Sequence, residues 1–478
     1  MTLDRSTRWL AMALLCLGDL MIVLDVTVVN VALPTIRGDL GFSEAGLAWV
    51  VNAYMVTFGG FLLLGGRLGD LYGPRRMFLV GVAMFTLASL GCGLAPTQGA
   101  LVAARAIQGC GGAVVSAVAL SLIVTLFQAQ DERAKAMGVF GFVSAAGGSI
   151  GVMLGGLLTQ TLGWHWIFLI NVPIGLGVLL ASWRLLPADA VPAERGSLDV
   201  AGAFTVTLAM LLAVYAIVGG NEAGWLSPRT LGLLAVSLAL ALTFLAIEAR
   251  VAAPLVPLKL LTLRGLAIAN TIGLLWAAAM FAAFFLSGLY LQLVLHDTPL
   301  QVGLAFLPTN LLMAAFSLGL SARIVLRFGN RGPIVAGLAM IAVGLALLAR
   351  APTDAGFALD LLPAFVLQGL GAGIALNPLL MAAMGEVGPD ESGLASGLIN
   401  TAFMLGGALG LAILASLAAA RTTALAAGGA DAVEALNGGY HAAFWMGAGF
   451  ATVATLVGLG ITGRAAEGEV LRPAAAHD

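Results

Sequence analysis

Three charged residues interrupt otherwise apolar stretches of this sequence: Asp19, Asp25 and Arg105. If these stretches cross a membrane, each charge costs about 2.5–3.5 kcal/mol on insertion scales and is a functional candidate by default. With a rise of about 1.5 Å per residue, Asp25 lies about 12 Å and Arg105 about 8 Å below the same face of the bilayer. The two opposite charges are at similar depth, which predicts a buried pair if their helices pack together.

Such a pair can bind a proton reversibly, because its strength depends on whether the carboxyl group of Asp25 is charged. A carboxyl group paired with a buried cation is the smallest set of groups that can couple proton movement to a conformational change. The alternative is a fixed ion pair that only specifies helix packing. Asp19 lies six residues before Asp25, which is about 240° around a helix and therefore a different face. It is either a second proton or cation site or a hydrogen-bonding partner of a neighbouring helix.

A stripe of small residues follows later in the chain, where Gly147, Gly151 and Gly155 are four residues apart. This spacing predicts a face that another helix approaches closely and that slides or hinges. The same stretch matches the Gly-x-Ser-x-Gly pattern of serine hydrolases around Ser149,. A serine nucleophile needs a base, and the four histidines fall in predicted loops, at span ends or in the tail. An intramembrane hydrolase is therefore the less favoured alternative.

The second half of the sequence offers side chains that could contact an organic ligand. Trp276, Met280 and Phe284 recur at helical spacing and could line a pocket for flat, apolar molecules, or could simply pack against helices and lipid. Three amide side chains could orient a ligand or join helices to one another. They are Asn270, Asn310 and Asn377.

Composition decides the broad class of the protein. Of the 478 residues, 60% are hydrophobic, 63 are glycine and only 10% are charged, whereas roughly 25% of a soluble protein is charged. This composition predicts an integral membrane protein in contact with the lipid bilayer. The net charge of −2 and the lack of a Lys/Arg block exclude a nucleic-acid-binding face. The three cysteines have no CxxC spacing, so we expect no disulfide, no metal and no cofactor other than the proton.

The apolar stretches long enough to cross roughly 30 Å of hydrocarbon number fourteen. No stretch alternates with the period of two that a membrane barrel requires, so the predicted fold class is all-α. The predicted spans are 9–33, 47–65, 77–95, 100–127, 137–159, 166–186, 200–219, 230–248, 266–291, 300–326, 332–350, 358–383, 393–418 and 441–462.

Positive charge predicts the orientation of these spans. Of the 22 Lys and Arg residues, 17 fall on the side of the N-terminus, four on the other side and Arg105 within a span. Because cytoplasmic loops carry the excess of positive charge, both termini are predicted to be cytoplasmic, in a multi-pass protein of the cell inner (plasma) membrane. The first span lacks a cleavage site and is interpreted as retained.

An internal repeat divides the chain. The loop that contains Gly66 and Arg75 is echoed at 322–331, Gln108 recurs as Gln368 and Gly147 as Gly406, at offsets of 256, 260 and 259 residues. We therefore predict two pseudo-symmetric six-helix bundles, residues 1–186 and 263–478, the second with a cytoplasmic tail. Two extra transmembrane helices with their flanking loops, residues 187–262, are inserted between them.

Four segments together resemble the major facilitator superfamily, specifically its fourteen-span drug:proton antiporters of the multidrug efflux type. They are LDVTVVNVALP at 24–34, GRLGDLYGPRR at 66–76, RAIQG at 105–109 and WHWIFLINVPIG at 164–175. The resemblance covers nearly the whole chain.

The resemblance implies alternating access between two bundles, a central apolar cavity and export driven by inward proton flow. By the family pattern, Asp25 and Arg105 serve proton coupling. Asp70 with Arg75 and Arg76 would hold a cytoplasmic latch in the outward-open state, because a carboxylate can face a helix N-terminus. The latch segment also includes Gly66 and Gly73.

From the membrane charges and these segments we expect a secondary active transporter rather than an enzyme. The predicted function is proton-coupled antiport that exports lipophilic, cationic or neutral small molecules such as drugs, antibiotics and dyes, by a monomer. Two alternatives keep the same fold: a proton-coupled uptake symporter and an exporter of one endogenous metabolite. A fold by itself does not separate them.

Overall fold

The computed structural model describes residues 4–461 except 128, 188, 190–198, 252–253, 317–320, 385–386 and 388–391. Throughout this described part the regular elements are helices, and no strand is present. The predicted all-α fold class is confirmed.

The helices follow the predicted apolar stretches. The first group is α1 (Arg5–Leu40), α2 (Glu44–Leu47), α3 (Trp49–Tyr72), α4 (Pro74–Gly93), α5 (Gln98–Leu126), α6 (Gln130–Thr161), α7 (His165–Leu169) and α8 (Asn171–Leu185). A hairpin of α9 (Val200–Ala223) and α10 (Pro228–Glu248) follows. The last group is α11 (Leu258–Leu261), α12 (Arg264–Leu293), α13 (Pro299–Ala315), α14 (Ser321–Phe328), α15 (Arg331–Leu348), the π-helix η2 (Phe357–Leu361), α16 (Leu362–Met384), α17 (Ser392–Ala427) and α18 (Ala432–Gly458).

Twelve helices are long and apolar enough to cross a membrane, by length and composition, among the residues that the structure describes. Neither α6 nor α13 is among the twelve, and α13 has only 17 residues. A multi-pass membrane protein is therefore confirmed, and the count of fourteen spans stays a prediction.

Local chemistry sets where these helices begin and end. Thr97 accepts a hydrogen bond from the backbone N–H of Ala100 at 3.2 Å and so caps α5,. Thr298 and Gln301 form a reciprocal capping box at the start of α13,. Between α3 and α4 the chain turns at Gly73, whose φ of 94° favours glycine,. Pro74 then opens α4 at a position where its missing N–H costs nothing,.

Pairs of helices cross at glycines in both halves of the chain. A Cβ atom added at Gly111 would lie 3.0 Å from the carbonyl oxygen of Gly81, so α4 and α5 approach at their backbones. The crossing of α15 and α16 has the same construction, with Gly337 against Gly371. The second pair follows the first by 256 and 260 residues, which are offsets of the repeat in the sequence.

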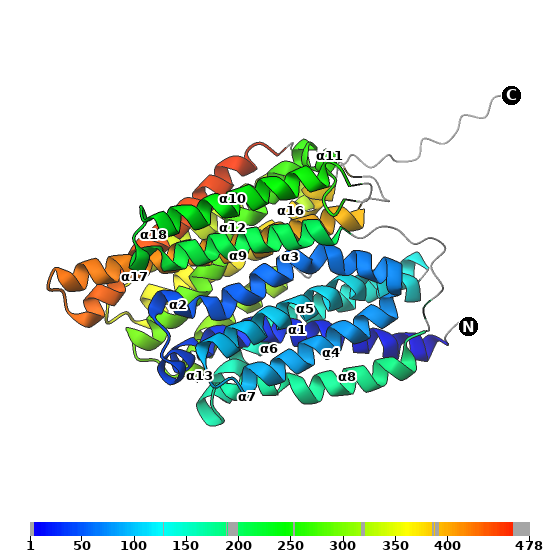
Figure 1. The fold of residues 1–478 in the computed structure, drawn as a ribbon, viewed down its shortest axis with the longest axis horizontal. Helices are drawn as coiled ribbons and strands as arrows, with labels where there is room; N and C mark the ends of the chain where they lie inside the picture. Colours follow the sequence, from blue (N-terminus) through cyan, green and yellow to red (C-terminus); the bar gives the residue numbers. More distant parts are fainter. Residues whose placement is uncertain are drawn as a thin grey trace.

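The helix contacts that join the first group of helices to the last include α3 with α17, α6 with α13, and α1 with α12. In the internal repeat, α3 corresponds to α13 and α6 corresponds to α17. The pseudo-symmetry between the repeats therefore relates the α3–α17 contact to the α6–α13 contact. The hairpin lies along this seam, where α9 packs against both α3 and α17. Figure 1 shows α9 and α10, in green, running side by side along one flank of the molecule.

Candidate functional site

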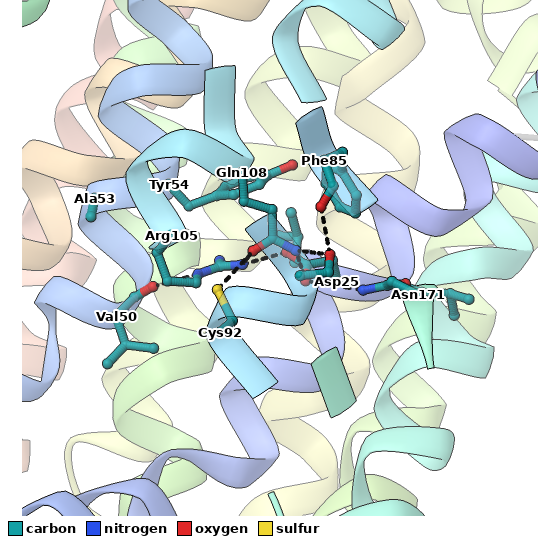
Figure 2. A network of polar contacts seen from close by, with 12 residues as sticks. Asp25, Val50, Ala53, Tyr54, Phe85, Cys92, Arg105, Gln108 and Asn171 are labelled. Carbon is teal, nitrogen blue, oxygen red and sulfur yellow. Dashed lines mark hydrogen bonds and ion pairs between the residues drawn. The ribbon is translucent and has the colours of Figure 1, made fainter. Parts of the chain in front are cut away.

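A buried polar network joins five helices in the first half of the chain, α1, α3, α4, α5 and α8 (Figure 2). Its carboxyl group is Asp25 on α1, its guanidinium is Arg105 on α5, and Gln108 lies one turn later on α5. Ser89 on α4 and Asn171 at the start of α8 complete it. Helix packing, rather than a local motif, brings these side chains together.

Arg105 is held on three sides. Its Nη1 atom donates to Asp25 Oδ2 and, at 2.7 Å, to Gln108 Oε1. Its Nε atom donates to the carbonyl oxygen of Val50 on α3 at 2.8 Å. The guanidinium carbon lies 4.4 Å from the ring centre of Tyr54, a cation–π distance,. The guanidinium therefore connects α1, α3 and α5.

Gln108 orients the carboxyl group from the other side. Its Nε2 atom donates to Asp25 Oδ1 at 2.7 Å and to Ser89 Oγ at 2.8 Å. Asn171 Nδ2 makes a longer contact of 3.4 Å to the same carboxyl oxygen. Each oxygen of Asp25 thus has at least one donor, as a buried carboxylate requires.

This network is sealed from solvent. Asp25 and Gln108 are 0% exposed and Arg105 is 1% exposed. Removing one charge of such a pair leaves the other buried and uncompensated, which is strongly unfavourable. A proton on Asp25 would have this effect, so the arrangement can couple one protonation event to a rearrangement of helices. The structure brings Asp25 and Arg105 together, as their depths in the sequence predict, and their role in proton coupling stays a prediction.

Sequence reasoning missed Gln108, Ser89, Asn171 and Tyr54 as members of this site. The repeat could have marked Gln108 as a candidate, since this residue recurs as Gln368. The repeat does not show, however, what the side chain contacts. Asp19 is buried on α1, 6% exposed, and both interpretations of it stay open.

The latch segment is held by a residue that the sequence did not single out. The backbone N–H groups of Arg75 and Arg76, in the first turn of α4, donate to the carboxylate of Asp189 at 2.8 and 3.0 Å. The carboxylate also occupies the position that a Cβ atom of Gly73 would take. Asp70, the acid of the family motif, is exposed on α3. It forms none of the ion pairs found in the described residues.

The glycine stripe on α6 faces α1. Cβ atoms at Gly147 and Gly155 would meet Leu20 and the backbone of Val28, at 2.8 Å in each case, and one at Gly151 would meet a side chain of α1 as well. This is the close approach that the spacing predicts, while sliding or hinging stays a prediction.

The aromatic candidates on α12 are mostly buried. Trp276 is 3% exposed and packs edge-on against Phe403, with 5.2 Å between ring centres. Met280 is buried, and Phe284 lies 5.2 Å from Phe306. The indole N–H of Trp276 is buried and has no hydrogen-bond partner.

The three amide candidates lie on α12, α13 and α16. Asn270 donates to the carbonyl oxygen of Leu266 at 2.9 Å and keeps its own oxygen unpaired. Asn310 is buried with its Nδ2 atom unpaired, whereas Asn377 makes a contact within the protein. Two of the three amides thus keep one buried polar atom without a hydrogen-bond partner.

A cavity of about 690 Å³ lies elsewhere, between α3, α4, α5 and α9. Its lining is apolar, and none of the predicted substrate residues contributes to it. Representative lining residues are Phe61, Leu64, Ile107, Cys110, Phe204 and Leu208. No sequence pattern predicts this cavity, because it forms where α9 packs against α3, α4 and α5.

The sequence profile of the Major Facilitator Superfamily matches residues 15–411. This chain belongs to the Major Facilitator Superfamily. It is therefore a membrane transporter of small molecules and not an enzyme, and the hydrolase alternative is wrong. The geometry agrees, since Ser149 Oγ is buried without any hydrogen-bond partner that could act as a base.

Relatives within the superfamily carry names that refer to antibiotics. The puromycin resistance protein pur8 of Streptomyces alboniger is 39% identical over 437 residues, covering 91% of this chain and 86% of its own. The cephamycin export protein CmcT of Amycolatopsis lactamdurans is 38% identical, covering 88% and 87%. The tetracenomycin C resistance and export protein of Streptomyces glaucescens is 33% identical, covering 87% and 77%.

Solved structures share the fold at low sequence identity. A bacterial homologue of the human lysosomal transporter Spinster, in an inward-facing conformation, matches with a TM-score of 0.67 and 15% identity, covering 96% of this chain and 98% of that one. The nucleoside transporter NupG matches with a TM-score of 0.66 and 12% identity, covering 95% and 99%. These likenesses support the transporter fold alone.

Proposed function

We propose that this protein is a proton-coupled antiporter that exports lipophilic, cationic or neutral small molecules, such as antibiotics and dyes, by alternating access. The observation that carries the coupling is the sealed network of Asp25, Arg105 and Gln108. Export and the substrate class rest on relatives named as resistance and export proteins. The coupling ion is the proton, and no cofactor takes part.

The network provides a route from protonation to movement. A proton on Asp25 removes the negative charge that holds Arg105 Nη1. Arg105 also holds the carbonyl oxygen of Val50 on α3, and α3 packs against α17 in the other half of the molecule. Protonation thereby changes the relative stability of two arrangements of the seam, which is the requirement for switching between them. Asp19 is a second candidate for a protonation site.

The proposed architecture has fourteen spans with both termini in the cytoplasm of a bacterial cell and the protein in its plasma membrane. Residues 1–186 and 263–478 form the two bundles that rock, and residues 187–262 carry the inserted hairpin. The glycine stripe of α6 and the latch segment are parts of the moving contacts. The protein functions as a monomer.

The substrate binds against α12, α13 and α16 in this proposal. Trp276, Met280 and Phe284 supply apolar and aromatic surface, while the unpaired polar atoms of Trp276, Asn270 and Asn310 supply hydrogen bonds. Asn377 orients the ligand from α16. The separate apolar cavity beside α9 has a volume within the range of drug-sized ligands, which supports a lipophilic substrate.

A narrower function is the second candidate. Several relatives are named for single compounds, namely puromycin, cephamycin and tetracenomycin C, whereas Stp of Mycobacterium tuberculosis is named a multidrug resistance protein. The single-compound names support an exporter of one metabolite as the alternative to a broad multidrug exporter, and a substrate panel separates the two.

The decisive experiment uses the purified protein in liposomes with an imposed pH gradient, and it records dye or antibiotic movement together with lumenal pH. We expect substrate-dependent proton flux in the wild type and its loss in Asp25→Asn. Asp354→Asn makes the same chemical change at an exposed loop position and should transport like the wild type. Normal proton-driven export by Asp25→Asn would contradict the coupling mechanism. Accumulation of substrate in energised cells would indicate uptake in place of export.

A further inference from the structure

Two carboxyl groups meet at the base of the inserted hairpin, outside the network described above. Asp199 is the N-cap residue of α9, and Glu248 is the last residue of α10. Each is 3% exposed. The helices that carry them pack along their length, so the end of one lies beside the start of the other.

Each carboxyl group uses one oxygen to fasten backbone. Asp199 Oδ1 accepts from the backbone N–H of Gly202 at 2.7 Å, which caps α9. Glu248 Oε2 accepts from the backbone N–H of Val256 at 3.0 Å, which holds the segment after α10. The pair therefore secures both chain segments that lead into and out of the hairpin.

The remaining two oxygens face one another. A Cβ atom at Gly202 would lie 3.0 Å from Glu248 Oε1 and closer still to Asp199 Oδ2, so both oxygens lie around one point. The two carboxyl groups are within hydrogen-bond reach. Because ionised carboxylates only accept hydrogen bonds, neither oxygen has a partner as an anion. A single hydrogen between them would satisfy both.

Within the part of the chain that the structure describes, no cation forms an ion pair with Asp199 or Glu248. The ion pairs found in the described residues are Arg5 and Arg8 with Glu132 and Arg105 with Asp25. Two adjacent carboxylates buried without a cation do not both ionise readily. Among the described residues, Arg67 and Asp70 on α3, Arg250 after α10 and Lys259 on α11 form no ion pair with either carboxyl group.

We propose that Asp199 and Glu248 bind one proton between Asp199 Oδ2 and Glu248 Oε1, as a protonation site that clasps the base of the α9–α10 hairpin. With the proton in place, Asp199 caps α9 and Glu248 holds the backbone of Val256. Without it, two buried negative charges repel, and the N-terminus of α9 and the segment at Val256 come apart. The pair lies on the α9–α10 hairpin, whereas Asp25 lies on α1, so the two are separate sites.

The sign of the pH effect follows directly. The clasp stabilises the folded protein at low pH, and this contribution is lost as the pH rises through the titration of the pair. In Glu248→Gln an amide N–H supplies the shared hydrogen at every pH, and its oxygen still accepts from Val256. Asp199→Asn does the same from the other side. Both variants should therefore lack this component of the pH dependence.

The first measurement is thermal unfolding of the purified protein in detergent from about pH 5 to pH 9, a range that lies above the ordinary titration range of a carboxyl group. We expect the melting temperature of the wild type to fall with pH relative to Glu248→Gln and Asp199→Asn. Glu222→Gln is the matched control, because Glu222 is an exposed residue of α9, at the other end of the hairpin. It should follow the wild type.

A local readout separates the clasp from general pH effects. Leu255 is 3% exposed beside Val256, so a Leu255→Cys thiol should react with maleimide several-fold faster at alkaline pH in the wild-type background than in the Glu248→Gln background. Parallel melting profiles or equal labelling in the two backgrounds would overturn the proposal. Low stability of both amide variants at every pH would also contradict it. A dependence on Na⁺ or K⁺ at fixed pH would indicate a metal cation in place of the proton.

Discussion

At the scale of single residues, the network around Asp25 depends on a side chain that both donates and accepts. Gln108 gives its amide N–H to the carboxylate and offers its oxygen to the guanidinium of Arg105. A carboxylate at 108 would repel Asp25, and an aliphatic side chain would leave both partners short of a hydrogen bond. The amide therefore positions the two charged groups relative to one another.

We predict that Gln108→Leu destabilises the protein by about 1–3 kcal/mol, the usual cost of leaving buried polar groups unsatisfied. Thermal unfolding in detergent measures this effect. The matched control is Gln368→Leu, because Gln368 is the repeat counterpart, 3% exposed, and its Nε2 atom has no partner. Gln368→Leu should lower the free energy of unfolding by clearly less than Gln108→Leu. Equal losses of stability in the two variants would show that the volume of the side chain, rather than the hydrogen bonds of Gln108, determines the effect.

At the scale of helices, the ends carry contacts that the helix interiors do not. The first turn of α4 has free backbone N–H groups, as every helix does, and here Asp189 satisfies two of them. The guanidinium of Arg75 reaches back to the carbonyl oxygen of Trp183 on α8. The segment after α8 is thereby fixed to the latch segment.

Asp189→Ala should lower stability by about 0.5–2 kcal/mol, the typical cost of removing a capping side chain. Asp189→Asn retains an acceptor oxygen but loses the charge that favours a helix N-terminus, so its effect should be intermediate. Unfolding of the two variants beside the wild type measures the order. Wild-type stability in Asp189→Ala would mean that the contact contributes nothing to the fold.

At the scale of the whole molecule, transport by alternating access requires the seam between the two halves to open. At the end of the seam beside the α3–α4 turn, α3 and α17 touch: the Cβ position of Gly397 lies 3.9 Å from Cγ of Leu63. A cross-link at this point joins helices of different halves. A cross-link between neighbouring helices of the same half joins helices that move together.

We predict that Leu63→Cys with Gly397→Cys, oxidised to a disulfide, abolishes export in proteoliposomes and that reduction restores it. The control pair is Gly91→Cys with Ala104→Cys on α4 and α5, where the Cβ atoms lie 3.5 Å apart, a separation that suits a disulfide. This cross-link should leave export intact. Full export with the seam cross-linked would exclude opening at this end.

The fold class, the membrane environment and the charged residues at the centre of the candidate site could all be predicted from the sequence. The reason is physical: backbone in hydrocarbon must satisfy its own hydrogen bonds, so long apolar stretches become helices. A charge in such a stretch is conspicuous because it is costly. The residues that form the Asp25–Arg105 pair could therefore be predicted from type and depth alone.

Tertiary structure decided the rest. Gln108, Ser89 and Asn171 became partners of Asp25 only through the rotation and packing of α4, α5 and α8, which periodicity does not specify. The contact of Asp189 with Arg75 spans 114 residues, and the meeting of Asp199 and Glu248 depends on how one hairpin closes. Each arises between segments distant in sequence, where side-chain packing rather than local preference selects the neighbours.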